Sequence, residues 1–220
     1  MTARFDQDLS ELKEKLLTMA AQAEASVRNA LRALVERDDD VARQVKEEDD
    51  ILDQLEMEVD EMAITLLAKA PLATDLRLIT VAMKVSHDLE RVGDEATAIA
   101  RRAVELNREP QLKPYIDIPR MTNMALDLLR EALDAFVHRD TPKARALIPR
   151  DKEVDALNKQ LHRELASYMI ESPATIELCL NLMTISKRLE RIADHATNIA
   201  EEVVYLYEAR DIRHTGKTGA

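Results

Sequence analysis

The amino-acid sequence predicts an all-α fold, arranged as two tandem three-helix bundles that are related by an internal repeat. The first observation behind this prediction is composition: the chain has 3 Gly, no Trp and 3% aromatic residues, which favours helices over strands. The second is that apolar residues recur at spacings of three and four, as on one face of a helix. The third is that LERVGDEATAIA, residues 89–100, returns as LERIADHATNIA, residues 189–200, with eight of twelve positions identical.

The first half of the chain, residues 1–108, predicts three helices. The first starts near Asp8 or Ser10, either of which can cap it, and ends before the acidic turn at residues 37–40. The second runs from residue 41 to about residue 70, where Pro71 stops it, and the third continues to about residue 107. The apolar stripe expected to bury the third helix consists of Leu78, Ala82, Val85, Leu89, Val92, Ala96, Ile99 and Ala103.

A proline-rich linker is predicted at residues 109–118, because prolines at 110, 114 and 119 accompany a stretch without apolar periodicity. The plan then repeats in a second bundle, residues 119–209, whose helices are expected at 121–138, 143–171 and 174–208. Pro149 is expected either to kink the fifth helix or to mark its late start. Residues 210–220 have no core face, and we expect them to form a flexible tail.

The charge of the chain excludes several kinds of partner. A formal net charge of −11 argues against a nucleic-acid or anionic-lipid surface, whereas metal cations and basic protein patches fit it. No apolar run approaches the ~20 residues of a membrane span, and the charged N-terminus is unlike a signal peptide. We therefore expect a cytoplasmic protein that does not insert into a membrane. Cys179 lies in an apolar run and is expected to be a small buried hydrophobe.

Four pairs of carboxylates stand at the spacing i, i+4. Like charges at this spacing weaken a helix by roughly 0.2 to 0.5 kcal/mol, so the pairs call for an explanation. Each copy of the repeated stretch carries one pair, and the second helix of each half carries another. Because the apolar stripe occupies another side of the third helix, we expect these carboxylates to lie outside the core, with only His87 and Lys187 as neighbouring cations. The pairs are Asp49 with Asp53, Glu90 with Asp94, Asp151 with Asp155, and Glu190 with Asp194.

Two interpretations of these acids remain open. Side by side, two such helices present four carboxylates, which suit Mg, Mn, Fe or Ca, and a cation removes the repulsion. Alternatively, the acids are solvated helix faces, which is common in a chain with 33% charged residues. The recurrence of the acids at one register, while neighbours such as His87/Lys187 differ, strengthens the metal interpretation but leaves both open.

Catalytic patterns are missing from the sequence. No histidine has a glutamate three residues before it, as di-iron carboxylate bundles require, and no phosphate-binding Gly-rich loop, zinc-type Cys cluster or serine nucleophile elbow occurs. His195 follows Asp194 and belongs either to a metal shell or to the surface. We therefore predict that the protein is not an enzyme.

The acid pairs, together with ATDLRLI at 73–79, LERVGD at 89–94 and LERIADHATNIAE at 189–201, resemble the PhoU family, regulators associated with the phosphate-specific transport system of bacteria. This resemblance implies two three-helix bundles whose acid motifs hold metal ions, iron or zinc in some members, with Mn or Mg also possible. It further implies negative regulation of the phosphate-starvation response, through a membrane sensor histidine kinase and the ATPase subunit of an ABC phosphate transporter. Two departures are Ala193, where the family commonly has Gly, and Pro149 close to an acid pair.

Other functions stay open at this point. One is an accessory regulator of a different phosphate or ion permease, and another is a metal-dependent storage or phosphohydrolase protein. Helices with many Ala and Met positions often offer a second packing face, so we also expect a homodimer.

Overall fold

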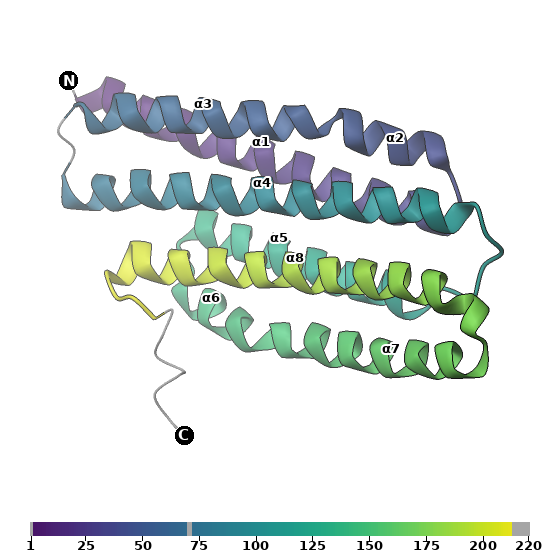
Figure 1. Ribbon diagram of the computed structural model, residues 1–220. Coiled ribbons are helices and arrows are strands. Elements are labelled where there is room, and N and C mark those ends of the chain that lie inside the picture. Colours follow the sequence, from purple (N-terminus) through teal and green to yellow (C-terminus); the bar gives the residue numbers. More distant parts are fainter. Residues whose placement is uncertain (1, 70–71, 213–220) are drawn as a thin grey trace.

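The computed structural model describes residues 2–69 and 72–212, and the regular structure within these ranges is entirely helical, as predicted. Eight α-helices and two short 3₁₀ turns follow one another along the chain (Figure 1). Their bounds are α1 Thr2–Val35, α2 Asp39–Glu47, α3 Asp49–Leu67, α4 Ala73–Asn107, α5 Asp117–His138, α6 Thr141–Leu147, η1 Ile148–Arg150, α7 Asp151–Glu171, η2 Pro173–Thr175 and α8 Ile176–Glu208.

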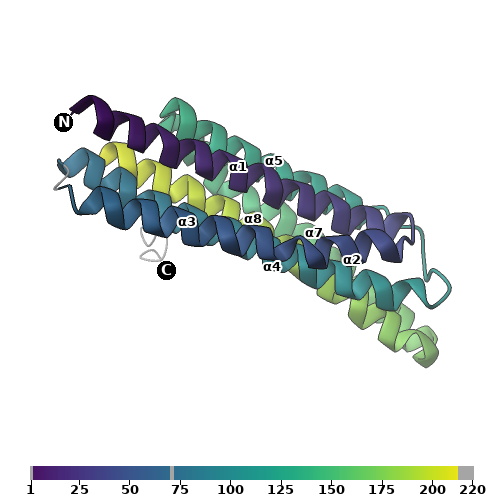
Figure 2. The same cartoon turned by 90° about the horizontal axis from the view of Figure 1, so that it is seen from above.

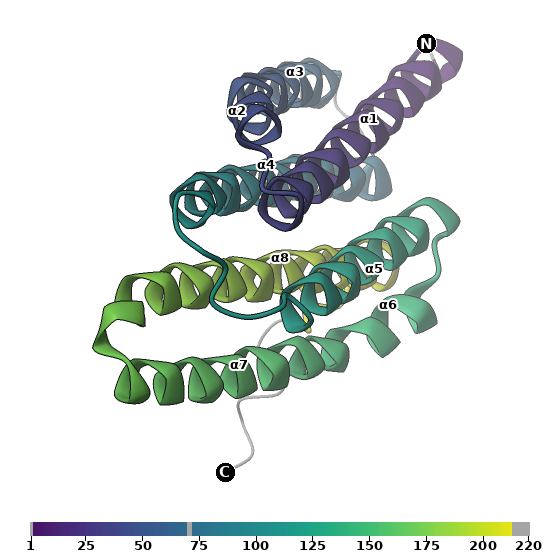
Figure 3. The same cartoon turned by 90° about the vertical axis from the view of Figure 1, so that its right-hand side faces the viewer.

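The two longest helices of the centre, α4 and α8, pack against each other and join the two halves. α1, α2 and α3 cover α4, while α5, α6 and α7 cover α8. In Figure 3, α4 and α8 lie in the middle of the molecule, with α2 and α3 beyond α4 and α7 beyond α8. α1 and α5 also contact each other across the two halves. Figure 2 shows that the helices of both halves run along one long axis. The first half and the second half have the same plan, as the repeat predicts.

The apolar stripe predicted on the third helix is confirmed, since every one of its residues is buried on α4. The matching face of α8 is buried as well, and the buried apolar residues form one cluster that continues from one half into the other. Fully burying one Leu or Val side chain contributes about 1.5–3 kcal/mol, so these faces dominate the stability of the fold. Independent folding of the halves on either side of residues 109–118 stays a prediction.

The repeated Arg-Asp dipeptide has a structural role at the end of the first helix of each half. Arg37 and Arg139 adopt left-handed backbone conformations, with φ of 58° and 59°. The next residue accepts backbone hydrogen bonds with its side chain: Asp38 from the N–H groups of Asp40 and Val41, and Asp140 from that of Lys143. One residue ends a helix and its neighbour caps the next, which explains why the pair recurs.

The prediction of one continuous second helix is wrong, because the helix breaks at Glu48 into α2 and α3. Glu48 keeps φ −83° and ψ −5°, so the break needs neither Gly nor Pro and leaves no signal in the sequence. Pro149 lies in η1, which interrupts the corresponding helix, so α7 starts late, at Asp151, as one of the two alternatives for Pro149 predicted. In both halves the break immediately precedes an acid pair, so Asp49 and Asp151 become the first residues of new helices.

Other boundaries differ by a few residues from those predicted. α1 begins at Thr2 rather than near Asp8, α5 begins at Asp117 within the predicted linker, and α8 begins at Ile176 after a 3₁₀ turn. Helix ends are weakly specified by propensity, since capping and packing decide them. The predicted stop at Pro71 and most of the tail, residues 213–220, lie outside the described residues.

Two further expectations concern burial and the membrane. Cys179 is fully buried with a free thiol, as predicted for a small hydrophobe. Within residues 2–69 and 72–212, we find no helix with the length and apolarity needed to span a bilayer.

Candidate metal centre

The first set of predicted ligands comes together at the seam between α3 and α4. Asp49 and Asp53 stand on the first turns of α3, and Glu90 and Asp94 stand one turn apart on α4. Burial, with the charges of Asp94 and Asp53, raises the pKa of Asp49. Burial and the charge of Asp94 likewise raise the pKa of Glu90. We call these four residues the first quartet; its neighbouring charges disfavour the ionised forms of Asp49 and Glu90.

The second set comes together in the same way at the seam between α7 and α8. Asp151 and Asp155 stand on α7, and Glu190 and Asp194 on α8. Burial and a hydrogen bond with Glu190 raise the pKa of the Asp155 carboxyl group. Partial burial and the charges of Glu190 and Asp155 raise the pKa of Asp194 to about 6. We call these four residues the second quartet.

Each quartet contains a buried oxygen atom without a hydrogen-bond donor. These atoms are Oε2 of Glu90 and Oδ1 of Asp151. The Nε atom of Arg91 approaches Oε2 of Glu90 to 3.4 Å without forming a hydrogen bond. An unsatisfied buried acceptor costs about 1–3 kcal/mol, and a charged one costs more. Carboxylate oxygens with no donor are ligands that a cation takes, so these two atoms fit a bound cation. Within the described residues, however, neither quartet brings three ligand atoms within 4.8 Å of one another as it stands.

Two expectations about the surroundings of the quartets need correction. The sequence analysis expected only His87 and Lys187 as compensating cations, but Arg91 Nη1 also lies 3.0 Å from Asp94 Oδ2. Arg91 stands three residues before Asp94 on the helix, so the spacing alone contained this signal. Glu190 was expected outside the core, yet it is only 9% exposed, because Asn158 and Lys187 cover it.

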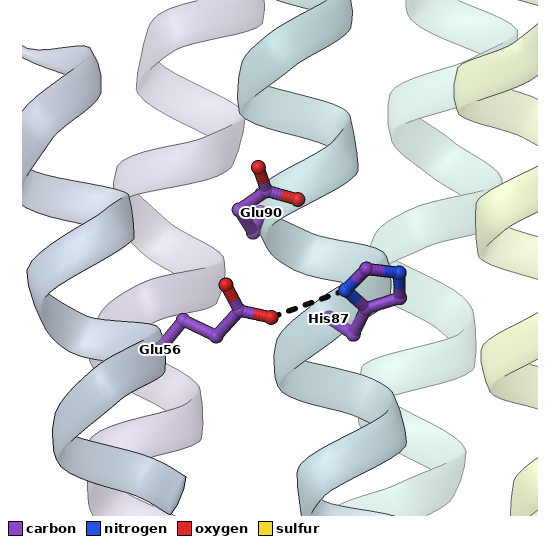
Figure 4. A group of neighbouring side chains, drawn as sticks. All are labelled: Glu56, His87 and Glu90. Carbon is purple, nitrogen blue, oxygen red and sulfur yellow. Dashed lines mark hydrogen bonds and ion pairs between the residues drawn. The ribbon is translucent and has the colours of Figure 1, made fainter.

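Two residues beside the first quartet were missed as ligands by the sequence analysis. Glu56 on α3 and His87 on α4 face Glu90, and these three side chains each offer one ligand atom within 4.8 Å of the others (Figure 4). His87 Nδ1 lies 3.1 Å from Glu56 Oε1. Glu56 follows Asp53 by three residues and His87 precedes Glu90 by three, so helical spacing could have found both.

The corresponding positions of the second half carry different chemistry. Asn158 occupies the position of Glu56, and Lys187 that of His87. Asn158 Nδ2 donates to Glu190 Oε2 at 2.9 Å, and Ser186 Oγ donates to Asn158 Oδ1 at 2.7 Å. Lys187 forms an ion pair with Glu190. The protein thus satisfies Glu190 with its own groups.

His195, for which the sequence left a metal shell or the surface open, lies instead at the contact of α4 with α8. Its Nδ1 atom is 2.8 Å from Asp88 Oδ1, and its side chain is 20% exposed. Asn198 Nδ2 donates to the same Asp88 oxygen at 3.3 Å. His195 therefore joins the two halves and does not face the second quartet.

A family model described as the PhoU domain matches the chain twice, over residues 16–103 and 118–203. The chain belongs to the PhoU family. A relative from Pseudomonas aeruginosa, named phosphate-specific transport system accessory protein PhoU homolog, is 40% identical over 220 residues, which cover 99% of this chain and 91% of that protein. A homolog of the same name from Aquifex aeolicus is 38% identical, and the match covers 94% of each protein.

Two solved PhoU structures have the same fold. The crystal structure of PhoU from P. aeruginosa matches with a TM-score of 0.90 at 40% identity, covering 94% of this chain and 100% of that one. The phosphate transport system regulatory protein PhoU from Streptococcus pneumoniae matches with a TM-score of 0.89 at 27% identity, covering 94% and 99%. The all-α fold with two PhoU repeats is therefore confirmed.

The departure at Ala193 is matched by a second change in this PhoU chain. In the first repeat, a Cβ atom on Gly93 would lie 2.2 Å from Leu52 Cδ1, so the Leu52 side chain would have to shift to admit it. In the second repeat Val154 stands at the position of Leu52, and both Val154 and Ala193 are buried. A smaller side chain on α7 accompanies the larger one on α8, which keeps the seam filled.

Proposed function

We propose that this protein is a metal-binding regulatory adaptor of phosphate uptake, which represses the phosphate-starvation response when phosphate is plentiful. It acts between a membrane sensor histidine kinase and the ATPase subunit of an ABC phosphate transporter, in the cytoplasm. The names of its relatives, which are accessory proteins of phosphate-specific transport systems, support this role. Those names describe accessory proteins and not enzymes, which agrees with the lack of catalytic patterns in the sequence.

The observation that carries the metal-binding part is the pair of quartets with their donor-free buried oxygens. Glu90 Oε2 in one repeat and Asp151 Oδ1 in the other accept no hydrogen bond from the described residues. A divalent or trivalent ion held by Asp49, Asp53, Glu90 and Asp94, and another held by Asp151, Asp155, Glu190 and Asp194, would neutralise both clusters. The PhoU resemblance favours Fe or Zn, and the carboxylates also suit Mn or Mg.

Deletion of the gene tests the regulatory part. We expect a phosphate-starvation reporter to become active in phosphate-rich medium when the gene is deleted, and to be silenced again by the wild-type gene on a plasmid. A reporter that stays silent in the deletion strain contradicts the repressor role. A transcriptional fusion to an unrelated housekeeping promoter is the control, because its output should not change.

We also propose a homodimer. Leu17 on α1 and Ile51 and Ile64 on α3 are 41%, 44% and 63% exposed, and they give the outer face of the first repeat apolar patches that a second copy can cover. Light scattering at micromolar concentration tests this proposal with and without added metal. A monomer mass under both conditions rejects it.

A further inference from the structure

Glu56, His87 and Glu90 are arranged as three ligands of one metal ion. His87 and Glu90 stand three residues apart and share a face of α4, while Glu56 reaches them from α3 (Figure 4). Their ligand atoms lie within 4.8 Å of one another. Ligands around a tetrahedral ion with bonds of about 2.1 Å are about 3.4 Å apart, so side-chain rotation alone brings these atoms into range.

The charges at this position call for a cation. Glu56 and Glu90 are both carboxylates; Oε2 of Glu90 accepts no hydrogen bond, and its ion pair with Arg91 Nε is long, at 3.4 Å. His87 contacts Glu56 through Nδ1, and its side chain is 57% exposed and can turn. An imidazole among carboxylates suits Zn²⁺, Fe²⁺ and neighbouring transition metals, whereas Mg²⁺ and Ca²⁺ take oxygen ligands only.

An entrance for the ion lies next to the three side chains. Glu56 and His87 line a groove with a volume of 600 Å³, which continues past Asp60 on α3 and Asp88 on α4. Metal sites that exchange their ion need such a route from solvent. Lys84 also lines the groove and pairs with Glu202, so the acids Glu56 and Asp60 are the ones that attract cations there.

The second repeat lacks this arrangement. Asn158 replaces Glu56; its amide group donates a hydrogen bond to Glu190 and accepts one from Ser186. Lys187 replaces His87, and an ammonium group has no lone pair to offer a metal. The ammonium group of Lys187 forms an ion pair with Glu190, so the protein itself provides the positive charge that neutralises this carboxylate.

From this contrast we infer that the first repeat binds a transition-metal ion of the Zn²⁺ or Fe²⁺ class through His87, Glu56 and Glu90, and that the second repeat has no nitrogen ligand and binds cations through oxygen alone. The inference rests on the metal-binding part of the function proposed above. It adds two ligands, His87 and Glu56, and a difference in metal preference between the repeats.

The test exchanges the Glu-His and Asn-Lys residue pairs between the two repeats of the full-length chain. One variant, Glu56→Asn with His87→Lys, gives the first repeat the residues of the second. The reciprocal variant, Asn158→Glu with Lys187→His, does the opposite. His138→Lys is the matched control, because His138 on α5 is also an exposed helical histidine beside a carboxylate, that of Asp134.

The metal-free proteins are titrated with Zn²⁺ by calorimetry, and the five histidines are followed by ¹H–¹⁵N NMR of the imidazole rings. We expect Zn²⁺ to shift the His87 ring in the wild type and in His138→Lys. The Glu56→Asn/His87→Lys variant should bind Zn²⁺ in the first repeat at least about tenfold more weakly. The reciprocal variant should gain a shifted imidazole at position 187. Helical circular dichroism checks that each variant is folded.

The other outcomes separate this inference from the proposed function. Zn²⁺ binding that is unchanged in Glu56→Asn/His87→Lys, with no shift of the His87 ring in the wild type, overturns the inference and leaves metal binding by the quartets intact. A wild type that binds neither Zn²⁺, Fe²⁺, Mn²⁺ nor Mg²⁺ overturns both.

Discussion

The two repeats have the same helices and the same quartet of acids, yet the side chains that contact Glu90 in the first repeat differ from those that contact Glu190 in the second. In the first repeat Glu90 faces a second carboxylate and an imidazole, and one of its oxygens has no donor. In the second repeat Glu190 receives a hydrogen bond from Asn158 and an ion pair from Lys187. A duplicated fold thus keeps its acid positions, while two neighbouring substitutions change the side chains that contact Glu90 and Glu190.

The contact between the repeats shows a second difference of this kind. Asp88 pairs with His195, and the positions related to them by the repeat, Arg188 and Glu95, also pair, at 3.0 Å. At each pair of related positions, one helix carries an acid and the other a base: Asp88 on α4 corresponds to Arg188 on α8, and Glu95 on α4 corresponds to His195 on α8. Approximate twofold symmetry fixes which positions meet between α4 and α8, but either sign of charge can occupy each position.

The largest effect is expected from removing metal. Chelation should lower the free energy of unfolding by about 2.7 kcal/mol for each occupied site, relative to protein with metal at 100 times its Kd, and should leave the fold intact because the apolar stripes remain packed. Replacing Glu190 and Asp194 by Ala should lower bound metal by about half, since the first quartet is untouched, and should weaken the response to chelator. Elemental analysis and thermal melts measure both.

The control for this prediction is an acid pair at the same spacing elsewhere. Asp127 and Glu131 on α5 are also four residues apart, and they pair with Arg130 and Arg150. Their replacement by Ala should change neither bound metal nor the chelator response. Unchanged metal content after replacing Glu190 and Asp194 would return the second quartet to the interpretation of a solvated helix face.

A smaller effect is expected at the contact between the repeats. Arg188→Ala should destabilise the protein by about 2 kcal/mol, because it leaves Glu95 buried with only Arg191 nearby, at 3.4 Å. Asp88→Asn should have a smaller effect, because its partner is a histidine, which also has a neutral form. Urea unfolding measures the two changes.

Arg28→Ala serves as the control, since it removes an exposed pair with Glu24 within α1. Such pairs contribute less than about 1 kcal/mol. Equal losses of stability in Arg188→Ala and Arg28→Ala would show that the buried pair adds nothing to the contact.

The packing difference between the seams predicts an effect of about 1 kcal/mol. Gly93→Ala places a methyl group against Leu52, and this overpacking should outweigh the gain in helix propensity. Adding Leu52→Val gives the first repeat the residues of the second and should recover much of the loss. Denaturant midpoints of the single and double variants test this. A Gly93→Ala variant as stable as the wild type means that Leu52 has room to move.

The smallest effect concerns pH. The pKa of Asp194 is raised to about 6 in the folded chain, so folding favours the protonated group between pH 3.8 and about 6. The contribution of Asp194 to stability therefore falls as the pH rises through that window. Without metal, Asp194→Asn should be more stable than the wild type at pH 7 by less than about 1 kcal/mol, because solvent screens the group, and the gain should vanish near pH 4.

Urea unfolding in the presence of chelator measures the difference between the two proteins at each pH, which removes the contribution of other titrating groups. With metal present the order should reverse, because a cation prefers the ionised carboxylate. A stability difference between the two proteins that is constant from pH 4 to pH 7 would mean that burial and the charges of Glu190 and Asp155 do not raise the pKa of Asp194.

Part of the candidate site was within reach of the sequence. The two acids of each pair could be predicted to lie on one helix face, because residues at i and i+4 are one helical turn apart. The sequence also showed that each half carries two such pairs on two different helices. Glu56 was not included, because a carboxylate on α3 is one of many in this chain until the structure shows which α4 residues it meets. Arg91 was overlooked although its spacing from Asp94 is local.

The sequence by itself determined the helical content, the duplication and the buried stripes, because these follow from local propensity and from a period of 3.6 residues. Only the tertiary structure decided the break at Glu48, the close approach of Leu52 to Gly93, and the pairing of His195 with Asp88. Each of these depends on which face of one helix meets which face of another. That choice is made by packing between residues about 40 to 110 positions apart, and no local pattern carries it.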